Sequence, residues 1–168
     1  MTILRTLKHW ALSPIPVKYS FPEEALGEIT QCIEKAETTT SAEFEVIIER
    51  SLPLDILKSN SVAHTRAEQL FAQYRVWDTE DNNGVLIYLN LSDHAIELVL
   101  DRAAARLFTQ EQLDVIVHKM SEKFQQKLFA KGICEAITEL AKVLSAHFPN
   151  KPVNDPLPNN PIISFRSE

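Results

Sequence analysis

The stretch RVWDTEDNNGVLIYL, residues Arg75–Leu89, decides the fold because an acid-rich loop runs directly into a continuous apolar segment. Three acidic side chains and two amides fall between Asp78 and Gly84. The apolar run that follows, Val85–Leu89, predicts a strand buried on both faces. Carboxylates this close together repel one another unless water, a cation or backbone N–H groups neutralise them. The loop is therefore either a solvated turn or a cation site.

Two further strands are predicted around this one. A turn at Ser92–His94 leads to a second apolar run, Ala95–Leu100, so the two runs are expected to form an antiparallel hairpin. Upstream, apolar and acidic residues alternate between Glu43 and Glu49. This period of two predicts another strand, near a sheet edge or beside a charged cleft.

Helical spacing of apolar residues predicts four long helices, over about 20–37, 61–74, 109–124 and 133–144. Capping boxes are expected at Ser20 with Glu23 and at Thr109 with Gln112, and Gly132 is expected to separate the last two helices. A strand, helix, strand order implies a parallel pair with a right-handed crossover. The fold class is therefore α/β, a three-layer α/β/α sandwich around a small mixed β-sheet.

Three segments are expected along the chain. Residues 1–19 form an N-terminal helix, over about 3–12, and a linker; residues 20–148 form the α/β/α domain; residues 149–168 form a Pro-rich extended tail without regular structure. The apolar residues of the tail are expected to dock on the domain itself, because apolar groups at a terminus tend to find a surface. These residues are Ile162, Ile163 and Phe165.

Composition excludes several classes of function. The formal net charge of −6 argues against a nucleic-acid-binding face, and only three glycines leave no Gly-rich phosphate loop. The N-terminus lacks the apolar core of a signal peptide and no run is long enough for a membrane span, so a cytoplasmic location is expected. Cys32 and Cys134 are expected to be buried reduced thiols, with a disulfide only if their two helices touch.

The predicted topology brings polar groups to one end of the sheet. Two strands begin there and the third ends there, so Glu43, Asp81, Asn82 and Asp101 are predicted to lie together, with Glu37 and Asp78 in reserve. Carboxylate and amide oxygens suit Ca²⁺ or Mg²⁺ rather than zinc. The alternative is that these side chains cap backbone N–H groups and Asn83-Gly84 forms a turn.

Converging carboxylates also predict a sign for one substitution. If the acids repel, Asp101→Asn stabilises the metal-free protein; if Asp101 caps a backbone N–H or pairs with Arg102, the same change destabilises it. Arg102 is the cation that the topology places at this end, where it is expected to bind phosphate or to pair with Asp78 or Asp81.

The chain resembles the TPM domain family over about residues 20–148. The resemblance rests on Ala42-Glu43, on the step Asn82–Ile87 and on the downstream pair of amphipathic helices. The segment Arg75–Thr79, followed by Asn82–Gly84 and Asp101-Arg102, looks like a short, stand-alone bacterial branch of the family. It implies an α/β/α sandwich, a Ca²⁺ site at one end of the sheet and, from some relatives, acid phosphatase activity. Many relatives have a Gly-Tyr-Gly turn where this chain has Asp101–Ala103.

Three functions follow as expectations. The first is a binding module with a divalent-cation site. The second is a metal-assisted, phosphatase-like hydrolase, for which no nucleophile is identifiable in the sequence. The third is a structural interaction module whose tail contacts a protein partner. All three are compatible with a chain that has no predicted membrane span.

Overall fold

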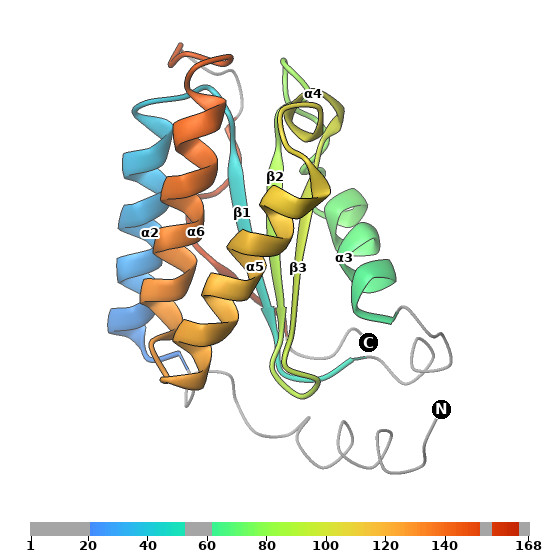
Figure 1. The fold of residues 1–168 in the computed structure, drawn as a ribbon, viewed down its shortest axis with the longest axis vertical. Helices are drawn as coiled ribbons and strands as arrows, with labels where there is room; N and C mark the ends of the chain where they lie inside the picture. The colour runs from blue at the N-terminus through green and yellow to red at the C-terminus, as the bar shows by residue number, and fades with distance from the viewer. Residues whose placement is uncertain (1–20, 53–61, 152–155, 165–168) are drawn as a thin grey trace.

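A computed structural model describes residues 21–52, 62–151 and 156–164. Four strands form one mixed sheet in the order β3-β2-β1-β4 (Figure 1). They are β1 (Phe44–Glu49), β2 (Val85–Asn90), β3 (Ala95–Leu100) and β4 (Ile162–Ser164). β1 pairs with β2 in parallel, β2 pairs with β3 antiparallel, and β4 lies parallel to β1 on its other side. The predicted hairpin and parallel pair are confirmed.

Five helices pack on this sheet. They are α2 (Glu23–Glu37), α3 (Val62–Gln73), the short α4 (Arg102–Ala105), α5 (Gln110–Gln125) and α6 (Phe129–Leu144). α2, α5 and α6 cover one face of the sheet, and α3 covers the other (Figure 1). The three-layer α/β/α sandwich predicted from the sequence is therefore confirmed.

Alternation along β1 divides its side chains between the two faces. Phe44, Val46 and Ile48 join the core beneath α2 and α6, whereas Ile47 joins the smaller core beneath α3. All six residues of β1 are buried, including Glu45 and Glu49. The strand was expected near a sheet edge or beside a charged cleft; β4 covers the edge next to β1, and Glu45 and Glu49 are buried.

Glu49 is held by a buried ion pair that the sequence did not predict. The Arg66 guanidinium on α3 donates to the Glu49 carboxylate at 2.7 and 3.1 Å, and the Tyr88 hydroxyl donates to it at 2.8 Å. Both charged side chains are at most 6% exposed. A carboxylate buried this deeply persists only because its oxygens are paired and hydrogen-bonded.

Two predicted helix boundaries are wrong. The N-cap of α2 is Pro22, which offers no side-chain acceptor, so the expected capping box at Ser20 and Glu23 does not begin this helix. Gly132 lies inside α6 instead of before it. A Cβ at this position would come within 2.9 Å of the Phe124 ring of α5, which explains the glycine there. The second capping box, at Thr109 and Gln112, is confirmed. The predicted helix at 3–12 lies outside the described residues.

The C-terminal tail contains regular structure. Ile162–Ser164 forms β4, so the prediction of an extended tail without a strand is wrong. The expectation that the tail docks on its own domain is confirmed for Ile162 and Ile163, which pack against the two cores. Phe165 lies outside the described residues. In the part of the chain that the structure describes, no helix is long and apolar enough to cross a membrane.

The two cysteines form a disulfide, so the prediction of reduced thiols is wrong. Cys32 on α2 and Cys134 on α6 are bonded, with their Cα atoms 5.6 Å apart. The two helices lie side by side over most of their length (Figure 1). This contact between the helices was the condition for a disulfide, and the sequence alone could not show it.

Candidate functional site

The predicted site lies at the end of the sheet where β1 and β2 begin and β3 ends. A chain of hydrogen bonds links the loops there: the Asn83 amide donates to Ser41 Oγ at 3.4 Å, and Ser41 Oγ donates to Asp81 Oδ2 at 3.1 Å. Lys151 Nζ lies 2.8 Å from the same Asp81 oxygen. The hydrogen bond from Lys151 holds the pKa of Asp81 below its usual value. Asp81 is thus ionised and already partly neutralised.

Asp101 is fixed at this end by two backbone bonds. Its N–H donates to the Gly84 carbonyl at 2.9 Å, and its Oδ1 accepts the N–H of Arg102 at 2.7 Å as the N-cap of α4. The cap uses Oδ1 of the Asp101 carboxylate and leaves Oδ2 without a hydrogen-bond partner. Asp101 therefore caps the backbone, as the capping alternative predicted, and the effect of neutralising Asp101 stays a prediction.

Two buried oxygen atoms at this end have no hydrogen-bond partner. They are Asp101 Oδ2 and Asn83 Oδ1, on side chains that are 7% and 1% exposed. Leaving a buried acceptor without a donor costs about 1–3 kcal/mol, and more when the group is charged. Within the described residues, these two are the buried side-chain oxygen atoms without a hydrogen-bond partner. Asn83 precedes Gly84 in the chain, and the N–H of Asp101 bonds to the Gly84 carbonyl.

Gly84 is required at this step by a close backbone approach. A Cβ on Gly84 would lie 1.9 Å from the carbonyl oxygen of Val76, a distance no side chain can adopt. The loop that carries Asn83 is therefore packed directly against the segment that follows α3. This contact fixes where the Asn83 side chain enters the fold.

Several predicted ligands have other partners. Asp78 pairs with Arg75 at the surface, and Asn82 Oδ1 accepts the Arg102 guanidinium at 2.9 Å. Arg102 therefore bonds to Asn82, and not to Asp78 or Asp81 as the sequence suggested. Among the residues that the structure describes, no group of three or more His, Cys, Asp or Glu side chains is arranged to hold a metal ion.

Glu37 and Glu43 belong to a separate group, with Glu45. Glu37 Oε1 accepts the N–H of Phe44 at 3.2 Å, and Glu43 Oε2 accepts the N–H of Leu157 in the C-terminal tail at 2.6 Å. Burial raises the pKa of Glu37 to about 7 and that of Glu45 to about 8, and repulsion among the three carboxylates adds to both shifts. The tail thus contacts Glu43, which lies beside two glutamates whose pKa values are raised.

Sequence reasoning placed Asn83 at the sheet end but left it out of the predicted ligands, and it missed Ser41 and Lys151. The position of Asn83 in the acid-rich loop, two residues before β2, was a usable signal. Ser41 had a weaker signal, its position before β1. Lys151 comes from beyond α6, and nothing in the local sequence brings it to the loop.

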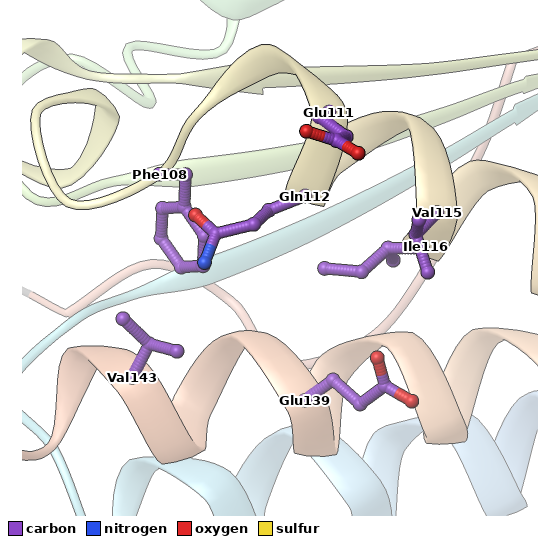
Figure 2. A pocket seen from close by; sticks show the side chains of 7 residues that line it. All are labelled: Phe108, Glu111, Gln112, Val115, Ile116, Glu139 and Val143. Carbon is purple, nitrogen blue, oxygen red and sulfur yellow. The ribbon is translucent and has the colours of Figure 1, made fainter.

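The packing of α5 on α6 leaves a cavity elsewhere. A cavity of about 330 Å³ opens between these helices, with Phe108 and Val143 at one end and Glu139 at the other (Figure 2). None of the predicted site residues lines it. It is a shallow gap on the helical layer and is separate from the sheet end.

These observations define the class of protein: a three-layer α/β/α domain with a small mixed sheet and a polar site at one end of that sheet. The model of the TPM domain matches residues 20–143. The chain therefore belongs to the TPM domain family. No curated protein matches it.

Two solved structures share the fold. One is the NMR structure of the BA42 protein from the psychrophilic bacterium Bizionia argentinensis, with 26% identity and a TM-score of 0.71 over 84% of this chain and 93% of that one. The other is the solution structure of the N-terminal domain of a protein from P. gingivalis, with 18% identity and a TM-score of 0.60 over 79% of this chain and 82% of that one. The second likeness concerns the fold alone.

Proposed function

We propose that this TPM domain is a binding module for one divalent cation, Ca²⁺ or Mg²⁺, at the sheet end between the β2 and β3 termini. The observation that carries the proposal is the pair of buried, unpartnered oxygens, Asp101 Oδ2 and Asn83 Oδ1. A carboxylate oxygen and an amide carbonyl oxygen are hard donors, which Ca²⁺ and Mg²⁺ prefer.

The surroundings fit a cation better than a phosphate ester. Asp81 Oδ2, Ser41 Oγ and Asn83 form one hydrogen-bonded chain, so further oxygen atoms lie near the Asn83 side chain. Arg102, the cation that could attract phosphate here, bonds to Asn82. Hydrolysis of a phosphoester therefore stays a prediction from the family resemblance, and no described contact favours it.

The ion would be held by few protein ligands. Glu37 and Glu43 bond to Phe44 and to the tail, and Asp78 bonds to Arg75. The ion would therefore be bound by Asp101 Oδ2, Asn83 Oδ1 and water. A site with few carboxylates and several waters binds Ca²⁺ or Mg²⁺ with modest affinity.

Thermal melting with and without cation tests this proposal on Asn83→Leu. This change removes Asn83 Oδ1 and keeps a side chain of similar volume. A cation at 100 times its Kd stabilises the native state by about 2.7 kcal/mol, which raises Tm by roughly 5–10 °C in a protein of this size. We expect this rise in the wild type with Ca²⁺ or Mg²⁺ and its loss in Asn83→Leu.

The metal-free melt of Asn83→Leu adds a second readout. Asn83→Leu removes a buried unsatisfied acceptor and, with it, the 3.4 Å hydrogen bond from the Asn83 amide to Ser41 Oγ, so the two effects oppose each other and the metal-free variant should melt close to the metal-free wild type. A variant that melts lower without cation and still gains stability with Ca²⁺ would show that Asn83 has a purely structural role. A wild type whose Tm is unchanged by millimolar cation would remove the proposal altogether.

A further inference from the structure

We propose a second binding site, for an amphipathic carboxylate, in a cavity at the opposite end of the sheet. The cavity measures about 550 Å³, and its lining residues come from the β2–β3 hairpin, the end of α5 and the start of α6. These segments lie at the same end of the molecule (Figure 1). Small-molecule sites in proteins typically enclose 300–1,000 Å³ and are lined mostly by apolar groups. The ligand would have one apolar body and one anionic head.

Apolar side chains form the body of this cavity. Leu91 and Ile96 come from the hairpin, and Phe124 and Phe129 come from the two helices. The rings of Phe124 and Phe129 pack in a tilted arrangement with centroids 5.2 Å apart, and Phe129 packs in the same way on the buried Phe21, also at 5.2 Å. This aromatic wall is anchored in the core, yet both lining rings are only partly buried. An apolar ligand therefore gains contact area without displacing the core.

The charged groups around the cavity favour a ligand whose head group is negatively charged. Lys127 and His94 are the ionisable side chains that line it, and neither an aspartate nor a glutamate does so. The contrast is clear within the chain, whose net charge is −6 and whose cavity between α5 and α6 is lined by Glu111 and Glu139. A local positive charge on an acidic protein favours an anion over a cation of the same shape.

The start of α6 adds a partial positive charge near the cavity. The helix begins at Phe129, and its N-cap residue Leu128 supplies no side-chain acceptor. The first N–H groups of a helix are unpaired and carry a partial positive charge. A carboxylate seated near Lys127 would lie at this end of the helix, with its apolar body against the two phenylalanine rings.

Titration with decanoate below its micellar concentration tests the proposal, followed by calorimetry and by the methyl NMR signals of Leu91 and Ile96. We expect saturable binding with shifts at both residues, and much weaker binding of decyltrimethylammonium, which has the same chain and the opposite charge. Absence of saturable decanoate binding, or equal binding of the two amphiphiles, would overturn the proposal.

Matched variants test where the anionic head and the apolar body of the ligand bind. Lys127→Glu should weaken decanoate at least tenfold, whereas Lys131→Glu, an equal charge change at an exposed lysine outside this cavity, should leave it unchanged. Ser121→Phe should block the body of the cavity. Equal affinities in the two lysine variants would overturn the proposal. Dimerisation of the ligand-free protein that Ser121→Phe abolishes would assign the cavity to a second copy of the chain, and would also overturn it.

Discussion

Removing the disulfide should destabilise the protein by several kcal/mol. Cys32 and Cys134 are separated by 102 residues and join α2 to α6, two helices of the main core. In the chain-entropy description, a cross-link that closes a loop of this length lowers the entropy of the unfolded chain enough to stabilise the fold by about 4.7 kcal/mol. For a domain of this size that corresponds to a loss of roughly 10–20 °C in Tm.

The assay is thermal or urea unfolding of three samples: the oxidised wild type, the wild type in excess dithiothreitol, and Cys32→Ser/Cys134→Ser. We expect the oxidised protein to be the most stable and the other two to melt together. The double variant serves as its own control, since reductant should not change its Tm.

Two results would refute this reasoning. One is a titration of two free thiols in the unfolded, non-reduced protein, which would mean that the bond does not form. The other is an oxidised protein that melts at the same temperature as the double variant, which would mean that the bond forms without constraining the unfolded chain.

Three further predictions concern buried charges and close contacts. Arg66→Ala should lower the free energy of unfolding by about 3–5 kcal/mol in urea melts, because it leaves a buried carboxylate unpaired; a loss below 1 kcal/mol would contradict the buried pair. Gly84→Ala should reduce the yield of folded protein or its Tm, because the added methyl meets the Val76 carbonyl; a wild-type Tm would contradict that contact. Burial raises the pKa of Glu37 to about 7 and of Glu45 to about 8, above the usual glutamate value of 4.5 in each case. The native state therefore holds these protons more tightly than the unfolded chain, and stability should fall as pH rises from about 5 to 8. The variant Glu37→Gln/Glu45→Gln should lose this pH dependence of the free energy of unfolding, measured by urea melts across the same pH range. An unchanged pH dependence would contradict the raised pKa values of these two glutamates.

Local patterns predicted much of the sheet. The hairpin of β2 and β3 follows from two apolar runs around a short turn, and the parallel pairing of β1 with β2 follows from the helix between them. The Thr109 capping box also fixed the start of α5. Each of these signals depends on residues that are close in the sequence, which is why the sequence alone was sufficient.

Contacts between distant segments could not be predicted in the same way. Gly132 was read as a helix break, but it is a point of close approach between α6 and Phe124. The cysteines were read as thiols because nothing in their separate helices shows that they meet. A strand of three residues in a Pro-rich tail has too little pattern to be recognised, and β4 forms because β1 offers it an edge.

The candidate site was predicted in position but not in its partners. Topology correctly brought Asp81 and Asp101 to the end where β2 begins and β3 ends. The partners of Asp81 are Lys151 and Ser41, which come from other parts of the chain. The cytoplasmic location stays a prediction, and disulfides that persist in a cell are more common in oxidising compartments.

Calorimetric titration of Ca²⁺ into the metal-free protein tests the proposed cation site most directly. Asp101→Asn removes one charge while an amide oxygen can still cap α4, and Asp78→Asn removes the same charge from the surface pair with Arg75 in the neighbouring loop. The account predicts one ion per chain in the wild type and in Asp78→Asn, with binding at least tenfold weaker in Asp101→Asn. Absence of binding in the wild type, or equal affinity in the two variants, would contradict it.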